Sequence, residues 1–209
     1  MMHHDELSRR QWSSHENSEW KLGVIACVLA LLTSLSFAQT QAGESSSRWK
    51  AVFQNRLASF GHRNWIIVAD SAFPVYATPG IELASSTEIL SSVLKYVAGA
   101  ISSSRHVRAT VFLGQELQFV EERDYPGVSE LRKQITAPFS RDQVSSISHT
   151  EVMSKIDEAG KTFRILFIKA SETIPYTSVY MRLDCGYMND EVEQKIRPAM
   201  PAAGSWELK

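Results

Sequence analysis

One aspartate closes a wholly apolar run of the chain, and its position makes it the first residue to suspect of chemistry. The run Trp65–Ala69 is typical of a strand that is buried on both faces, and Asp70 follows it directly. In open α/β sheets, ligands gather at the carboxyl ends of the strands. Because a carboxylate is costly to bury unless something binds it, we expect Asp70 to act in binding or catalysis.

Two histidines stand at places where they could exchange protons with a ligand. His62 lies shortly before Asp70, in the loop between an expected helix and the apolar run, and a structural or exposed histidine fits that place as well. His149 follows Ser148, which forms a capping box with Glu151 at a helix start. The helix dipole there disfavours the imidazolium form, so the neutral ring can act as a base or a hydrogen-bond acceptor. A surface histidine at a helix start is the alternative.

The elements that must position these residues alternate between strands and helices. Apolar runs predict strands over residues 65–69, 109–113, 163–170 and 178–183. Apolar spacing and capping signals predict helices over 48–60, from a Ser85–Glu88 capping box to Ile101, over 129–135 and from Ser148 to Gly160. Residues 71–84, with two prolines and a glycine, are expected to form a loop. The alternation predicts an α/β sheet with parallel strand pairs.

Composition narrows the class of protein. The chain has 209 residues, 44% of them hydrophobic and 22% charged, with a net charge of −1, which predicts one globular domain and no nucleic-acid partner. Its two cysteines, Cys27 and Cys185, cannot form a disulfide framework. The sequence contains no G-x-S-x-G elbow, P-loop, G-x-G-x-x-G turn, H-E-x-x-H helix or metal-ligand spacing. We therefore expect neither a nucleotide cofactor nor a metal.

Residues 1–38 have the features of a secretory signal peptide. The apolar run Leu22–Leu32 follows Lys21, and small residues stand at the −3 and −1 positions before Gln39. This run is short for a transmembrane helix, which needs about 20 apolar residues. We therefore expect export to the periplasm or out of the cell, with a membrane anchor over residues 22–38 as the alternative. We interpret residues 39–47 as a flexible leader, 48–190 as the domain and 191–209 as an irregular tail.

Three motifs follow one another along the domain. They are Phe60–His62 with Ile66–Pro74, then Ile147–Glu151, then Ile168–Ser178. In this order they resemble the bacterial ribose pyranase and fucose mutarotase family. Its members carry Leu-Gly-His, an apolar strand ending in Ala-Asp-Ala, a Leu-Pro or Phe-Pro, a Ser/Thr-His-Glu-Glu helix start, and Ile-Arg-Thr-Gly-Glu-x-x-Pro-Tyr-Ala-Asn. The matches span about residues 49–188, nearly the whole domain.

The resemblance implies a single three-layer α/β domain with a mostly parallel sheet flanked by helices. It also implies a cofactor-free isomerase that interconverts anomers or ring forms of a monosaccharide by acid–base ring opening. By motif, His62 corresponds to the proton-transfer histidine, Asp70 to the aspartate that orients the sugar or that histidine, and His149 to a second active-site histidine. Tyr176 corresponds to the tyrosine that contacts sugar hydroxyls, and Ser178 stands in the adjoining sugar-binding position.

The sequence departs from the family pattern around the sugar-binding positions. Ser178 replaces the asparagine, Met153 replaces a lysine one turn after the second histidine, and Lys169–Glu172 replaces Arg-Thr-Gly-Glu. We therefore expect the ring-opening reaction to be kept, whereas ribose or fucose as its substrate is the less secure expectation. The rival hypotheses are an exported carbohydrate-binding protein without turnover and a structural ring-forming protein. The resemblance further implies a ring-like homo-oligomer with shared active sites, in which the Tyr176 segment completes a neighbour's pocket.

Overall fold

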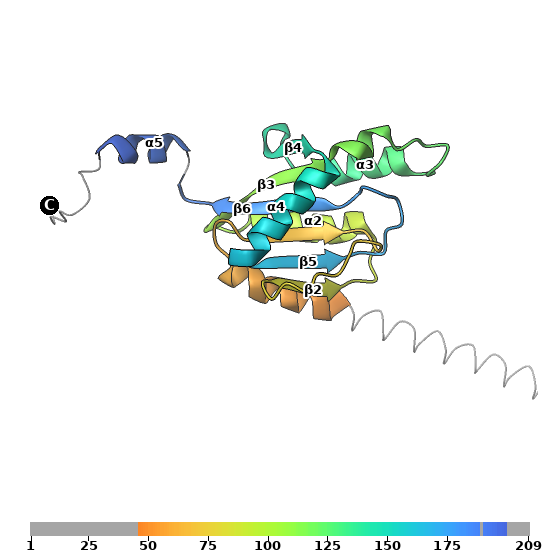
Figure 1. Ribbon diagram of the computed structural model, residues 1–209, viewed down its shortest axis with the longest axis horizontal. Coiled ribbons are helices and arrows are strands. Elements are labelled where there is room, and N and C mark those ends of the chain that lie inside the picture. Colours follow the sequence, from red (N-terminus) through yellow and green to blue (C-terminus); the bar gives the residue numbers. More distant parts are fainter. Residues whose placement is uncertain (1–45, 189, 200–209) are drawn as a thin grey trace, which may run out of the picture. The chain divides into compact units, whose positions relative to one another are not determined.

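A six-stranded sheet forms the centre of the fold in the computed structural model, which describes residues 46–188 and 190–199 (Figure 1). The strands lie in the order β2–β5–β1–β6–β3–β4. Their bounds are Trp65–Ala69 for β1, Ile81–Ser85 for β2, Val107–Gly114 for β3, Val144–Ile147 for β4, Ile165–Lys169 for β5 and Val179–Cys185 for β6. The pairs β1–β5, β2–β5 and β3–β4 are parallel, whereas β6 runs antiparallel to β1 and β3. The predicted α/β class with a mostly parallel sheet is confirmed.

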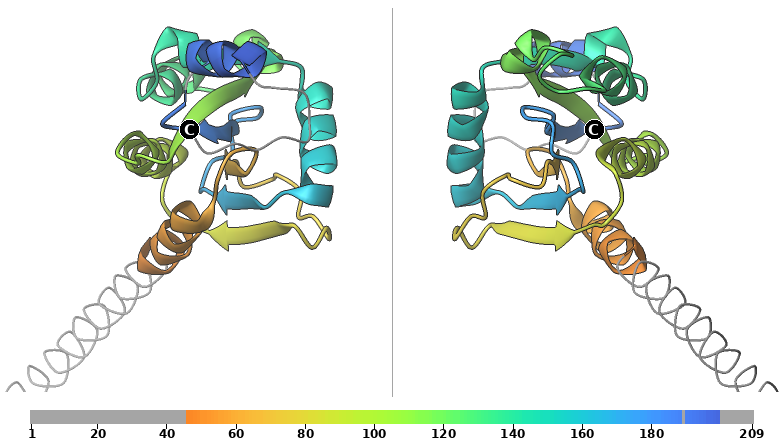
Figure 2. Two further views of the ribbon diagram at one scale, coloured as in Figure 1. Left: turned by 90° about the vertical axis from the view of Figure 1, so that its left-hand side faces the viewer. Right: turned by 90° about the vertical axis from the view of Figure 1, so that its right-hand side faces the viewer.

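Helices cover both faces of this sheet and make it the middle of three layers. The helix of residues 46–59 and α2 (Leu90–Ser102) lie on one face, and α4 (His149–Thr162) lies on the other (Figure 2). Helix α3 (Val128–Thr136) packs into the same core as α2. Two short 3₁₀ helices, η1 (Gln115–Phe119) and η2 (Arg141–Gln143), and the helix α5 (Asp190–Ala199) complete the described elements.

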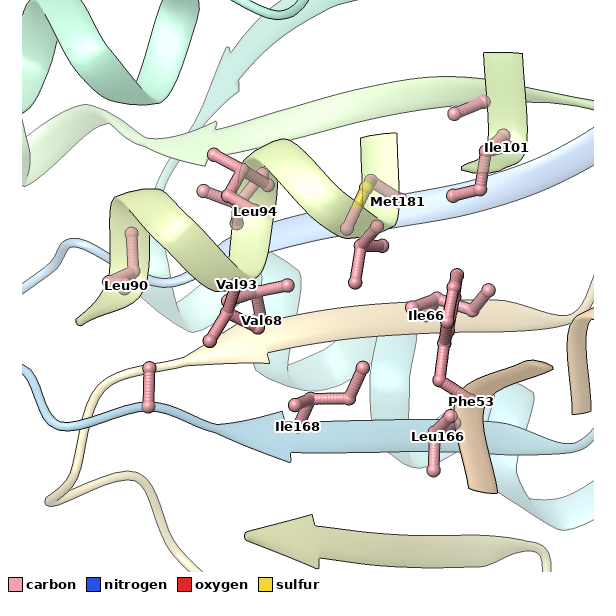
Figure 3. Close-up of a cluster of buried hydrophobic side chains, with 14 of the residues drawn as sticks. Phe53, Ile66, Val68, Leu90, Val93, Leu94, Ile101, Leu166, Ile168 and Met181 are labelled. Carbon is pink, nitrogen blue, oxygen red and sulfur yellow. The ribbon is translucent and has the colours of Figure 1, made fainter. Parts of the chain in front are cut away.

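The alternation of side chains along β1 divides the core into two clusters. Ile66 and Val68 face the helix 46–59 and α2, while Ile67 faces α4. In the larger cluster, Leu94 of α2 and Phe53 lie fully buried against the sheet (Figure 3). Each fully buried leucine or isoleucine stabilises the fold by roughly 1.5–3 kcal/mol. This packing holds β1 in a fixed position, and with it the residues that flank the strand at both ends.

Several predicted elements are confirmed, and the capping box before α2 is wrong. The Ser148 hydroxyl accepts the Glu151 amide hydrogen at 3.2 Å, as the sequence predicted for the start of α4. Ser85, in contrast, is the last residue of strand β2, whose first four residues lie in the region 71–84 expected to be a loop. Helix α2 begins at Leu90 without a side-chain cap. The Glu88 carboxylate instead accepts hydrogen bonds from Ser46 and Trp49. The signal for β2 was weak because an edge strand of five residues buries few of its side chains.

The C-terminal tail forms a helix that the sequence analysis did not predict. The tail was predicted to be irregular, but residues 190–199 form α5, because Glu, Gln, Lys and Arg dominate there and all favour helix. The signal peptide or anchor of residues 1–38 and most of the leader lie outside the described residues and stay predictions. Within the described parts of the chain, every helix is too short or too polar to cross a bilayer.

Candidate active site

Four of the five predicted site residues meet at one edge of the sheet, which we call the carboxyl edge. Strands β1, β3, β4 and β5 all end there, and β1 delivers Asp70 while β4 leads into His149. Because β6 is antiparallel to its neighbours, its first residue pairs with residues near their carboxyl ends. Val179 lies opposite Val68 of β1 and Leu113 of β3. Strand order and direction therefore bring the segment before β6, with Tyr176 and Ser178, to Asp70.

Asp70 is half-buried and held by hydrogen bonds on both oxygens. Its Oδ2 accepts the Ser178 hydroxyl at 2.7 Å, and its Oδ1 accepts the Ala72 amide hydrogen at 3.1 Å. The Ser178 oxygen in turn accepts the Asp70 amide hydrogen at 3.1 Å, and Ser178 is 2% exposed. Ser178 thus holds Asp70 from behind instead of facing solvent. A carboxylate has about four acceptor positions, so Asp70 keeps capacity for ligand hydroxyls.

Tyr180, the second residue of β6, is buried beside this edge. Burial raises the pKa of Tyr180, a hydrogen bond with Ser178 acts against that rise, and the nearby charges of Asp70 and Glu116 add to it. The hydroxyl of Tyr180 therefore stays protonated across the physiological range. We call Asp70, Ser178, Tyr180 and Glu116 the polar cluster of this edge. The Asp70 carboxylate accepts its hydrogen bond from Ser178, and the Glu116 carboxylate accepts one from the His149 amide.

His149 and Tyr176 form the aromatic side of the carboxyl edge. The two rings meet edge to face, with centroids 5.6 Å apart and an interplanar angle of 80°. Tyr176 is 42% exposed and has a φ of 61°, a left-handed conformation that is unfavourable for a non-glycine residue. Such strain persists where the surrounding structure enforces it, which is often at a binding site. The two rings thus form one aromatic contact at the carboxyl edge, and the Tyr176 ring is open to solvent.

Glu116 is a member of this cluster that the sequence analysis missed. It stands two residues after the end of β3, and its Oε1 accepts the backbone amide hydrogen of His149 at 2.8 Å. The signal was available, because a carboxylate just beyond a strand is the feature that singled out Asp70. Among residues 46–188 and 190–199, no three His, Cys, Asp or Glu side chains converge as metal ligands do.

His62 lies at the opposite edge of the sheet, which we call the amino edge. It is exposed and precedes β1, whose five residues span roughly 13 Å at about 3.3 Å per residue. His62 and Asp70 are close in the sequence but lie at opposite ends of β1, so they are far apart in space within one chain. His62 lines a cleft of about 640 Å³ together with Arg108, Arg182 and Asp184. The structure does not bring His62 to the other four predicted site residues.

The fold is similar to those of solved sugar mutarotases and pyranases, although no protein-family model and no curated protein matches the chain. RbsD from Bacillus subtilis, complexed with D-ribose, shares 18% identity over 63% of this chain and 89% of that chain, with a TM-score of 0.46. The fucose mutarotase from Streptococcus pneumoniae, in complex with L-fucose, shares 13% identity over 63% and 89%, with a TM-score of 0.44. FucU from Bifidobacterium longum shares 14% identity over 63% and 91%, with a TM-score of 0.41. At this low identity the likeness is one of fold.

Proposed function

We propose that this chain is a monosaccharide mutarotase or pyranase, an isomerase that opens and recloses the cyclic hemiacetal of a sugar without a cofactor. The observation that carries the proposal is the meeting of Asp70, His149 and Tyr176 at one edge of the sheet, from three distant segments. These residues also lie in the motifs that resemble the pyranase and mutarotase family. A carboxylate, an imidazole and an exposed phenol together suit the binding of hydroxyl groups and the transfer of protons.

The reaction needs one proton acceptor and one proton donor at the bound sugar. The acceptor takes the proton of the anomeric hydroxyl, whose O–H electron pair becomes the second bond of the carbonyl. The bond from the anomeric carbon to the ring oxygen breaks, and the ring oxygen takes a proton from the donor. Ring closure reverses these transfers and yields the other anomer or ring size. A positioned acid or base contributes about 10²–10⁴-fold to such a step. The histidines supply these two functions, and Asp70 orients the sugar.

Including His62 in the site requires a second copy of the chain. His62 is exposed at the amino edge, and Tyr176 is exposed at the carboxyl edge. A head-to-tail contact sets the amino edge of one copy against the carboxyl edge of the next, and it closes into a ring when the rotation allows. We therefore include a homo-oligomeric ring with shared sites in the proposal, with a monosaccharide as its ligand.

The test is anomer exchange followed by NMR with D-ribose, L-fucose and a panel of other monosaccharides. The wild-type chain is expected to accelerate exchange of at least one sugar above the rate in buffer. A His149→Ala variant is expected to lose that acceleration, whereas Lys155→Ala, at an exposed position on the same helix, should retain it. A folded wild-type chain that accelerates exchange of none of these sugars contradicts the proposal.

A second candidate function is carbohydrate binding without turnover. It is favoured by the loss of polar groups around the site. The Ser178 hydroxyl donates its hydrogen bond to Asp70 and is not free for a sugar. At the position where the related family has a lysine, the Met153 sulfur lies 3.5 Å from the Tyr76 hydroxyl. Titration that shows sugar binding while exchange stays at the buffer rate would favour this candidate.

Export is the remaining part of the proposal, and it rests on residues 22–38. The mature chain from the native host is expected to begin near Gln39. N-terminal sequencing checks this, and an intact chain beginning at Met1 in the cytoplasm contradicts it.

A further inference from the structure

One oxygen at the carboxyl edge is an acceptor without a donor. Glu116 Oε2 is buried and has no hydrogen-bond partner among the described residues, whereas Oε1 accepts the His149 amide hydrogen. Buried polar atoms are almost always paired, and an unpaired carboxylate oxygen is among the costliest exceptions. An unpaired acceptor in such a place calls for a donor that arrives with a ligand.

The surroundings of this oxygen place it inside the proposed sugar site. A Cβ at Gly114 would stand 3.3 Å from Glu116 Oε2 and 3.8 Å from the Tyr176 backbone oxygen, so Glu116, Gly114 and Tyr176 are close neighbours at this edge. Through Oε1, the same carboxylate accepts the backbone amide hydrogen of His149. Glu116 thus lies beside the segments that carry His149 and Tyr176.

The charge of the cluster indicates what kind of donor would arrive. Asp70 and Glu116 are both carboxylates, and like charges repel an anionic ligand such as a sugar acid or a sugar phosphate. An uncharged hydroxyl supplies one donor without adding negative charge. A hydrogen bond from a hydroxyl to an ionised carboxylate is also stronger than one between neutral groups.

We propose that Glu116 is a specificity-determining residue that contacts the substrate, with Oε2 accepting a hydrogen bond from one hydroxyl of the bound sugar. This assignment rests on the proposed function. Oε1 remains on the His149 amide, so the same side chain ties the start of α4 to the ligand. The sugar hydroxyl satisfies the acceptor that the free chain leaves unpaired.

A structural role for Glu116 makes a different prediction. If the side chain only caps α4, then Glu116→Gln should behave as wild type, because the amide oxygen can still accept the His149 hydrogen. Only Glu116→Ala would then lose stability. If Oε2 contacts the sugar, Glu116→Gln should fold normally and bind the sugar about 10- to 100-fold more weakly, the range for loss of a charge-assisted hydrogen bond. Glu130→Gln, an exposed carboxylate on α3, serves as the matched control.

The deciding experiment measures sugar affinity for wild type, Glu116→Gln and Glu130→Gln, using the sugar that wild type exchanges and each of its monodeoxy analogues. One analogue is expected to bind wild type as weakly as the parent sugar binds Glu116→Gln, and to lose nothing further in that variant. Full affinity in Glu116→Gln, or equal losses for all analogues, overturns the assignment while the proposed function stands. If the wild-type chain is oligomeric and the Glu116→Gln variant is not, the assignment is also overturned, because Oε2 then serves a contact between copies. A wild-type chain that binds no sugar overturns both proposals.

Discussion

The two edges of the sheet differ in the kind of buried polar atom that each leaves without a partner, although the same strand β1 runs between them. At the carboxyl edge, the unpaired buried atom is an acceptor, Glu116 Oε2, and Asp70 adds a second carboxylate. Among the described residues, the buried atom without a partner at the amino edge is a donor, Nε of Arg182, a residue that lines the cleft with Arg108 and His62. Asp142 and Asp184 line the same cleft, so the amino edge presents both donors and acceptors.

The largest expected effect comes from the carboxyl edge. His149→Ala should reduce anomer exchange by about 10²–10⁴-fold, because it removes an acid–base group from the site. Circular dichroism should show an unchanged fold, since the Ser148 hydroxyl still caps α4. Exchange measured by NMR checks this, and a rate equal to wild type would remove His149 from the mechanism.

Mixing inactive subunits tests whether the two edges contribute to one shared site. His62→Ala and Tyr176→Phe should each reduce exchange strongly, because each removes a group that a shared site needs. When the two inactive variants are mixed and reassembled, part of the activity should return, since some pockets then combine an intact His62 with an intact Tyr176. A monomer in analytical ultracentrifugation, or mixed rings without recovered activity, would refute shared sites.

A smaller effect is expected from the residue behind Asp70. Ser178→Ala leaves Asp70 Oδ2 without its 2.7 Å hydrogen bond, which should cost about 1–3 kcal/mol of unfolding free energy. Sugar affinity should also fall, because the carboxylate is no longer held in place. Urea denaturation measures the first effect, and sugar titration measures the second. Unchanged stability would mean that the hydroxyl does not hold Asp70.

The smallest effect lies outside both edges, at the start of α3. Hydrogen bonds from the Gly127 and Ser129 amides to the Glu122 carboxylate hold the pKa of this group at about 2, below its ordinary value of 4.5. Its contribution to stability is therefore present above pH 4.5 and is lost as the pH falls from there towards 2. The difference in Tm between wild type and Glu122→Gln should shrink across that window. A difference that stays constant from pH 5 to pH 2 would contradict this.

Local signals account for what could be predicted from the sequence. The apolar run before Asp70 and the Ser148 cap before His149 are set by neighbours in the chain, so both residues were placed correctly at strand and helix ends. Glu116 was missed although it stands two residues after β3, because its hydrogen bond to the His149 amide depends on how β3 and α4 come together. His62 was placed correctly in the loop before β1, but its distance from Asp70 was not predicted, because a buried strand turns a short sequence separation into a long distance. Pairing between distant segments, which the sequence pattern does not contain, decides both cases.

A crystal structure of the chain with the sugar that it exchanges would locate the proposed sugar site directly. We expect the sugar at the carboxyl edge, with its hydroxyls within hydrogen-bonding distance of Asp70 and Glu116 and its ring beside His149 and Tyr176. We also expect His62 of a second copy to reach the anomeric centre. A sugar bound in the amino-edge cleft of a single copy, with the carboxyl edge empty, would contradict the account.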